Sequence, residues 1–459
     1  MLKRIAGYFA TGRDEEQREL SAEELRREYE SRRWSVFLSV TLGYGFFYVC
    51  RLSFSMAKKP MLDGGVLTEE QMGLAGGIML LVYSLGRFTN GVLADRANIR
   101  RFISFGLMGS AIANLALGFS NGALFFGVMW ALNGWFQSIG SAPCIVSLTQ
   151  WFAPSERGTR YGLWSIAHGI GEGLSFLFTS MLVAAAGWQW GFWGPGVFCV
   201  VVALVLLRTL MDRPQTYGLP RVDVYKGEVE KGKGAETLSS AEVKRLQVGV
   251  LLNWQVWTLG LAGAAMYVSR YGVNSWGSVY LQEAKGYTGV EAGALLSVHP
   301  MLGLIGSAAS GWVSDRFFGA RRNVPCVIFG AMLMLGLGLL WMVPGGNKVL
   351  DAVALGMFGF AVGGLLVYLG GLMATDVVPQ RATGTAMGLV GFLCYGGAAL
   401  QDWVSGLLIG AGRRASGGAA AYDGVMMFWV VAAVVALLLP LIVWRWGGVG
   451  RNRRGSAGV

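Results

Sequence analysis

Long apolar segments recur along the whole chain, and they constrain its fold more than any other feature. Of the 459 residues, 54% are hydrophobic and only 14% are charged. The apolar segments repeatedly reach the ~18 to 20 residues that a helix needs to cross a bilayer. The sequence therefore predicts an all-α membrane protein with twelve transmembrane helices. The predicted spans are residues 34–57, 71–94, 102–119, 123–149, 160–186, 190–208, 250–282, 289–313, 323–344, 350–376, 384–410 and 424–445.

The distribution of basic residues predicts the orientation of these spans. If the chain starts inside the cell, the cytoplasmic segments hold 29 of the 38 Lys and Arg, whereas the outer loops hold six. Cytoplasmic segments normally carry the excess of Lys and Arg, so both termini are predicted to be cytoplasmic. Lys58, Lys59, Arg413 and Arg414 are local exceptions among the outer residues. The predicted location is the inner or plasma membrane of the cell.

Polar segments divide the spans into two groups of six. The predicted units are an amino-terminal cytoplasmic helix (1–33), a six-helix bundle (34–208), a cytoplasmic linker (209–249), a second six-helix bundle (250–445) and a basic tail (446–459). Within the first unit, residues 14–33 are predicted to be helical, with Ser21 and Glu24 in the spacing of a capping box.

One short pattern recurs at matching places in the two halves. Tyr-x-x-Arg lies inside a long apolar run as Tyr48 to Arg51, and again as Tyr267 to Arg270, 219 residues later. A second pattern, Gly-x-x-x-Asp-Arg, follows spans two and eight at an offset of 220 residues. Two different motifs share one repeat period, which predicts two bundles related by a pseudo-two-fold axis.

Short polar loops are predicted to gate or brace the bundles. Arg157 precedes span five in Pro-Ser-Glu-Arg-Gly, and Arg381 precedes span eleven in Pro-Gln-Arg, where charges can pair with neighbouring helix ends. The alternative is that the polar loops only anchor the cytoplasmic side by positive charge. Anchoring, however, does not require the aspartates of the Gly-x-x-x-Asp-Arg pattern, Asp95 and Asp315. The predicted gating residues are Gly91, Asp95, Arg96, Arg157, Gly311, Asp315, Arg316 and Arg381.

Arg51 and Arg270 are the leading candidates for an anion site. An arginine inside a membrane costs from ~2.5 to ~10 kcal/mol or more, so two at matching places indicate a function. The guanidinium is always charged and offers a planar fork of donors that matches phosphate or carboxylate. Snorkelling to the headgroups is the alternative. It does not explain the same tyrosine three residues before each arginine.

His168 lies eight residues into span five, on the helix face that also carries Trp164 and Glu172. It can hydrogen-bond a phosphate, and its charge responds near neutral pH. A carboxylate one turn away favours the protonated imidazole, and an unpaired buried glutamate would be costly. A packing role for the histidine is the alternative.

The chain resembles the organophosphate/phosphate antiporter family of the major facilitator superfamily. The resemblance covers residues 34–445 and rests on FFYVCRLSF at 46–54, YSLGRFTNGVLADR at 83–96, GWFQSIGSAPC at 134–144, WFAPSERG at 151–158, LWSIAHGIGEG at 163–173, RPQTYGLP at 213–220 and YVSRYGVNSW at 267–276. The family includes glycerol-3-phosphate and hexose-phosphate transporters and a hexose-phosphate sensor. The resemblance implies a twelve-helix transporter rather than an enzyme.

The resemblance also implies roles for individual residues. The family arginines that bind the substrate phosphate match Arg51 and Arg270, and the family histidine matches His168. Arg87 stands where relatives carry a basic residue, one turn after Tyr83, and is expected to guide anions. Tyr48, Tyr267 and Tyr395 match family tyrosines, and a phenol suits a sugar hydroxyl or a phosphate oxygen. Each tyrosine alone fits a packing role equally well.

Some positions depart from the family pattern. Ser141 and Ala142 replace a tryptophan and a proline of many relatives, His299 and Pro300 fall where relatives often have a glutamate, and Glu172 replaces a small residue. The acid and lysine that some hexose-phosphate carriers use fall on Ala398 and Gln401, with Asp402 expected to face elsewhere. The resemblance therefore describes the phosphate end of the substrate better than the organic end.

The predicted function is exchange of an organophosphate, such as a sugar phosphate or glycerol 3-phosphate, for inorganic phosphate by alternating access. The alternatives are a membrane sensor that signals to a partner kinase, and proton-coupled symport through Glu172 and His168. No cofactor, metal or nucleic-acid partner is predicted, because the chain lacks nucleotide motifs and its five cysteines lie in apolar segments without metal-ligand spacing. The protein is expected to act as a monomer in the lipid bilayer.

Overall fold

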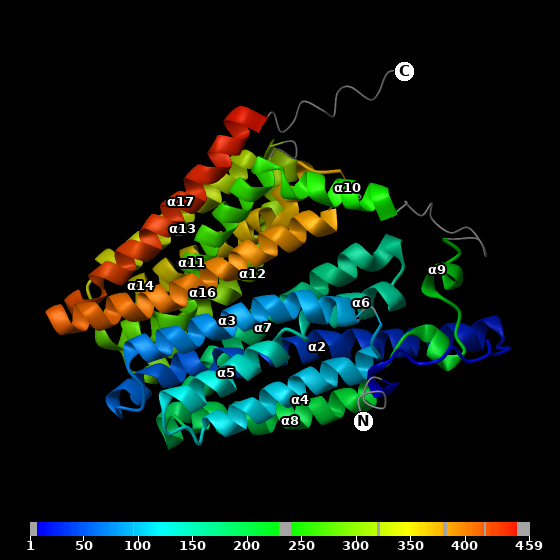
Figure 1. Ribbon diagram of the computed structural model, residues 1–459, viewed down its shortest axis with the longest axis horizontal. Helices are drawn as coiled ribbons and strands as arrows, with labels where there is room; N and C mark the ends of the chain where they lie inside the picture. Colours follow the sequence, from blue (N-terminus) through cyan, green and yellow to red (C-terminus); the bar gives the residue numbers. More distant parts are fainter. Residues whose placement is uncertain are drawn as a thin grey trace.

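The protein is built from helices packed side by side in two groups (Figure 1). The computed structural model describes residues 7–94, 96–228, 240–318, 322–379, 383–416 and 419–447. The helices are α2 (Ala22–Asp63), α3 (Glu69–Ala94), α4 (Ile99–Leu117), α5 (Ala123–Gln137), α6 (Ser141–Trp151), α7 (Pro154–Ala186), α8 (Trp190–Thr209), α9 (Val222–Tyr225), α10 (Ser240–Leu251), α11 (Trp254–Glu283), α12 (Gly289–Phe318), α13 (Asn323–Met342), α14 (Lys348–Val367), α15 (Met373–Asp376), α16 (Thr383–Ala415) and α17 (Asp423–Gly447).

The twelve predicted spans all correspond to helices. In the part of the chain that the structure describes, nine helices are individually long and apolar enough to cross a membrane, and α10 with α11 form a tenth candidate bent by 56°. α4 and the broken pair α5–α6 supply the other two. The break falls at Ser138 to Gly140, between the two helices. Pro143 lies in the first turn of α6, where a missing N–H costs little.

The two bundles meet along three helix pairs. α2 packs against α11, α3 against α16, and α7 against α12, with the first helix of each pair in the amino-terminal bundle. These pairs follow the sequence repeat. α2 and α11 are the first spans of the two bundles, so their contact relates equivalent helices. α3 and α12 are the second spans and α7 and α16 are the fifth, so the repeat makes the α3–α16 pair equivalent to the α12–α7 pair. The described residues therefore form two bundles, each with six predicted spans, related by pseudo-two-fold symmetry.

The bundles touch at one end and separate at the other. We call the end where α2 begins and α17 ends the base end, and the opposite end the far end (Figure 1). At the far end, Gly73 of α3 and Gly406 of α16 approach so closely that a Cβ on Gly73 would lie 3.0 Å from the Gly406 Cα. At the base end, a Cβ on Gly384, Gly388 or Gly391 of α16 would meet no described atom within 4 Å.

Segments before the first span and after the sixth pack together at the base end. Asp212 accepts hydrogen bonds from the backbone of Gly12 and from the Asn98 side chain, both at 3.0 Å. The ring of Tyr29 stacks on that of Tyr225 at 4.0 Å. The start of the linker is therefore fixed to the amino-terminal bundle.

The amino-terminal helix differs in part from the prediction. The capping box of Ser21 and Glu24 is present, but the helix begins only at Ala22, so residues 14–21 are not helical. It then continues into the first span without a break. Outside the predicted spans, Arg33 pairs with Glu156 of α7. Partial burial alone would raise the pKa of Glu156, but Arg33 and Lys226 lower it below its ordinary value.

Candidate functional site

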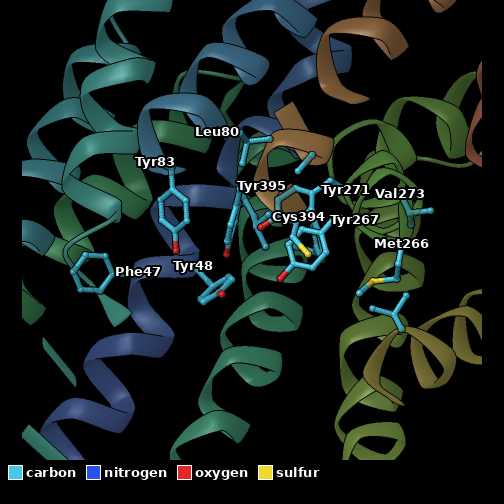
Figure 2. Packing of buried hydrophobic residues seen from close by; sticks show 14 of the residues in the cluster. Phe47, Tyr48, Leu80, Tyr83, Met266, Tyr267, Tyr271, Val273, Cys394 and Tyr395 are labelled. Carbon is cyan, nitrogen blue, oxygen red and sulfur yellow. The ribbon is translucent and has the colours of Figure 1, made fainter. Parts of the chain in front are cut away.

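Aromatic and charged side chains gather between the two bundles, near the middle of the helices. Figure 2 shows the rings of Tyr48, Tyr83, Tyr267, Tyr271 and Tyr395 together in one region. The ring of Tyr83 on α3 lies 4.8 Å from that of Tyr395 on α16, so the cluster crosses the interface. All five side chains are buried among their neighbours. The predicted site tyrosines are thus brought together, joined by Tyr271.

Among the described residues, Arg51 is hydrogen-bonded through its Nε but not through its two terminal amino groups. Its Nε donates to Gln137 Oε1 at 3.2 Å, and Gln137 is fixed in turn by its own bonds to the Phe47 carbonyl at 2.9 Å and Ser110 Oγ at 2.7 Å. The guanidinium carbon lies 4.3 Å from the ring centre of Tyr83 and 4.8 Å from that of Tyr48. Nη1 and Nη2 are buried and have no hydrogen-bond partner among the described residues. The two terminal amino groups of a fixed, charged fork thus remain available to a ligand.

Arg270 differs from Arg51 because its positive charge is paired with a carboxylate of the other bundle, that of Glu172. Its Nη2 lies 2.8 Å from Glu172 Oε2 and 2.7 Å from His168 Nε2. Glu172 is 1% exposed and also accepts a hydrogen bond from Asn274 of α11. His168 Nε2 lies 3.2 Å from Glu172 Oε2. The expected proximity of His168 and Glu172 is present, but the principal partner of the carboxylate is Arg270.

The predicted residues of α7 and α3 line the same region. The His168 ring lies 4.8 Å from the Tyr48 ring, which links α7 to α2. Trp164 stacks on Tyr44 at 4.6 Å. Arg87 is exposed, and its guanidinium carbon lies 5.3 Å from the ring centre of Tyr395 in the other bundle. This position between the bundles suits the predicted guiding role of Arg87, which stays a prediction.

Sequence reasoning missed several polar residues of this region. Gln137, Tyr271 and Asn274 contact the two arginines or Glu172 directly, and each stands in a motif that carried the family resemblance. A polar amide inside an apolar span was the available signal. Tyr271 directly follows Arg270 in the sequence.

The expectations for Lys58 and Asp402 were wrong. Lys58 was assigned to an outer loop, but it lies within α2 and is fully buried. Asp402 was expected to face elsewhere on its helix than Ala398 and Gln401, but it follows Ala398 by one turn, lies 3.3 Å from Lys58 and accepts a hydrogen bond from Trp276 Nε1 at 2.6 Å. Lys58 stands two turns after Arg51, on the same face of α2, and that spacing was the missed signal.

The predicted gating residues are only partly described. Arg157 donates to the carbonyls of Thr149 at 3.1 Å and Phe152 at 3.4 Å, so it caps the end of α6. Gly91, Arg96, Gly311 and Arg316 lie at the base ends of α3 and α12, where both arginines are exposed. Asp95, Arg381 and the side chain of Asp315 lie outside the described residues. A gating role for this set stays a prediction.

No metal or cofactor site was predicted. In the described ranges, His, Cys, Asp and Glu nowhere form a group of three or more that could hold a metal ion. The five cysteines, which lie in the predicted apolar segments, are buried thiols without disulfide partners.

Solved structures resemble the fold. The bacterial homolog of the human lysosomal transporter Spinster, in an inward-facing and unoccupied conformation, superimposes with a TM-score of 0.73 over 90% of this chain and 97% of that chain, at 18% identity. The nucleoside transporter NupG superimposes with a TM-score of 0.66 at 13% identity. At such identities the similarity concerns the fold alone.

Sequence comparisons narrow the class of protein. The Major Facilitator Superfamily profile matches residues 34–401. The membrane sensor protein UhpC of Salmonella typhimurium is 34% identical over 83% of this chain and 86% of its own length. A protein of Chlamydia pneumoniae named "probable hexose phosphate transport protein" is 32% identical over 95% and 96%. The glycerol-3-phosphate transporter of Bacillus subtilis is 30% identical over 91% and 94%.

The fold and the profile define a multi-pass membrane protein of a transporter superfamily. Within it, the chain belongs to the organophosphate:phosphate antiporter family, as the resemblance predicted.

Proposed function

We propose that the protein is a secondary transporter that exchanges a phosphate ester for inorganic phosphate by alternating access. The observation that carries this proposal is the state of Arg51, whose charge is buried and whose two terminal amino groups lack described protein partners. A buried charge of this kind is costly unless a counter-ion accompanies it. Phosphate offers pairs of oxygens that match the guanidinium fork.

The charges of the site suit a dianion. Arg51, Arg87 and Arg270 are positive, Glu172 is negative, and a neutral His168 leaves two positive charges uncompensated. A phosphate monoester or inorganic phosphate carries about −1.5 to −2 charges near pH 7. Either ligand therefore balances the site, which supports exchange of one for the other.

The same balance explains why exchange is favoured over one-way transport. We infer that the ligand bridges Arg51 of the amino-terminal bundle and Arg270 of the other bundle. Glu172 moderates the repulsion at Arg270, but Arg51 and Arg87 stay uncompensated without an anion. Closing the bundles around such a site would bury net positive charge at low dielectric, where repulsion is far stronger than in water. Reorientation without a ligand is therefore slow.

The packing of the bundle ends supports alternating access. The close approach of Gly73 and Gly406 at the far end, and the absence of described atoms near the base-end glycines, are what we expect of a carrier open to one side only. The excess of Lys and Arg in the base-end segments supports placing both termini in the cytoplasm. We therefore assign the conformation as inward-facing and the location as the inner membrane of a bacterium.

The substrate class follows from the family and from the site lining. The relatives are named as transporters of hexose phosphate and of glycerol 3-phosphate, so a sugar phosphate or glycerol 3-phosphate is the proposed ester. The tyrosines between the bundles offer hydroxyl groups and ring faces to such a molecule.

Sensing is the second candidate function. The named sensor UhpC is among the most similar relatives, and the base-end segments before α2 and after α8 form a folded surface on one bundle that suits a kinase partner. Proton-coupled symport has less support. A proton on Glu172 would have to replace its contacts with Arg270, His168 and Asn274.

Exchange in proteoliposomes tests the proposal. Vesicles loaded with phosphate should take up labelled glycerol 3-phosphate or glucose 6-phosphate, whereas phosphate-free vesicles should take up very little. A sensor would bind the ester in calorimetry but exchange it under neither loading condition. Strong uptake into phosphate-free vesicles that requires an inward proton gradient would refute antiport.

A further inference from the structure

A buried ion pair joins the two bundles on the far side of Arg51. Lys58 Nζ of α2 lies 3.3 Å from Asp402 Oδ1 of α16, and their side chains are 0% and 5% exposed. Lys58 Nζ also donates to Ser275 Oγ at 2.6 Å, and Ser275 Oγ donates to Asp402 Oδ1 at 2.7 Å. Trp276 Nε1 donates to the same oxygen, and Lys58 Nζ lies 3.8 Å from the centre of the Trp276 ring. Three helices from two bundles therefore share one buried network.

The other ion pairs that join the bundles at the far end are more exposed. Arg414 pairs with Glu70, and the Arg414 side chain is 69% exposed. Arg413 pairs with Glu69, and its side chain is 39% exposed. Exposed pairs contribute little, whereas removing one partner of a buried pair leaves an uncompensated charge. Lys58 and Asp402 are therefore the pair whose loss should most affect far-end closure.

The network lies on the helices that carry the two substrate arginines. Lys58 follows Arg51 by two turns of α2, and Ser275 follows Arg270 along α11. A cavity of about 40 Å³ lies between the two levels, and both Arg51 and Asp402 line it. Movement of α2 relative to α11 at the arginines therefore also moves Lys58 relative to Ser275, which is hydrogen-bonded to Asp402 of α16.

We propose that Lys58 and Asp402 form a latch that keeps the far end closed while the base end is open, and whose opening is coupled to anion binding at Arg51 and Arg270. The latch rests on the alternating-access function proposed above. When the base halves of α2 and α11 close around an anion, their far halves separate and withdraw Lys58 from Asp402. Without the anion, nothing offsets the loss of the buried pair, and the far end stays closed.

Thiol labelling tests the latch without any transport measurement. Ser55 lines the cavity between Arg51 and Asp402, and its hydroxyl is buried without a described partner. A Ser55→Cys reporter, in a background whose native cysteines are replaced, should react slowly with a membrane-impermeant maleimide from either face of the vesicle. Adding Lys58→Met or Asp402→Asn should raise the far-face rate by about tenfold, because an unpaired buried charge destabilises the closed state.

Three further variants separate a latch from general destabilisation. Lys285 and Asp351 form an equally buried pair at 3.1 Å, but both belong to the carboxy-terminal bundle, so Lys285→Met should leave the labelling rate unchanged. Lys59→Met removes a more exposed pair across the same interface, Lys59 with Glu283 of α11 at 3.5 Å, and should have a smaller effect. Removing both charges in Lys58→Met/Asp402→Leu should return the rate toward that of the reporter alone, and this variant also serves if the single variants do not fold.

Two results would overturn the proposal. One is an unchanged far-face rate in folded Lys58→Met and Asp402→Asn. The other is an equal increase in Lys285→Met. Phosphate binding to the same purified proteins is measured separately by calorimetry. If the reporter protein binds phosphate but the latch variants label at the rate of the reporter alone, the latch is refuted and the proposed function is not. If the latch variants label faster as expected but the reporter protein binds no phosphate, the proposed function is refuted.

Discussion

Replacing Arg51 by lysine keeps the positive charge of the site but removes the guanidinium fork. The Nε bond to Gln137 fixes the plane of the fork, and Nη1 and Nη2 are the groups left for the ligand. Lysine cannot make that bond and present two parallel donors at once. We expect phosphate binding to weaken, while insertion and folding change little.

The contacts give the size of the effect. One hydrogen bond to a charged ligand is worth about 1.5–3 kcal/mol, and leaving Gln137 Oε1 without its donor adds about 1 kcal/mol. The expected loss of about 2.5–4 kcal/mol corresponds to a Kd about 70- to 900-fold higher. Arg270→Lys should act in the same direction, because one ammonium group cannot contact Glu172, His168 and the ligand together.

The assay is titration calorimetry of purified protein with inorganic phosphate. The control is Arg208→Lys, an equivalent substitution at an exposed position in the last turn of α8, which should leave the Kd unchanged. Thermal unfolding confirms that each variant is folded. A Kd within about threefold of wild type for both Arg51→Lys and Arg270→Lys would refute the central anion site and restore the snorkelling interpretation.

Three other variants test separate parts of the structure. Gln137→Leu should weaken phosphate binding about tenfold without moving the charge of Arg51, since only the orientation of the fork is lost; an unchanged Kd in calorimetry would contradict this. Glu172→Gln should tighten phosphate binding but slow exchange in proteoliposomes, because it adds positive charge to the ligand-free site; weaker binding would show that Glu172 chiefly positions Arg270. The pKa of Glu156 is lowered in the folded protein, so its ionised carboxylate stabilises the fold near neutral pH. This contribution is lost as the pH falls through the lowered pKa. The thermal midpoint of Glu156→Gln should therefore fall less than that of wild type when the pH drops below about 4, and parallel pH profiles would exclude this contribution.

Much of the fold is determined by local sequence. Hydropathy identifies the spans because each helix must bury its own backbone bonds in an apolar solvent, a requirement that depends on neighbouring residues only. The Tyr-x-x-Arg repeat likewise revealed both arginines, since a charge in an apolar run is conspicuous without any structure. The break between α5 and α6 was missed, because an apolar window averages over the short turn at Ser138 to Gly140.

The partners of the charged residues were decided by tertiary structure. Glu172 and Arg270 are 98 residues apart, and Lys58 and Asp402 are 344 residues apart, so no local pattern connects them. The sequence placed Glu172 one turn from His168, but only the packing of α7 on the other bundle brings Arg270 to the same carboxylate. Lys58 looked like a loop residue because hydropathy places a lysine near a span end in water. Its burial depends on α11 and α16 supplying Ser275, Trp276 and Asp402, and that arrangement exists only once the two bundles meet.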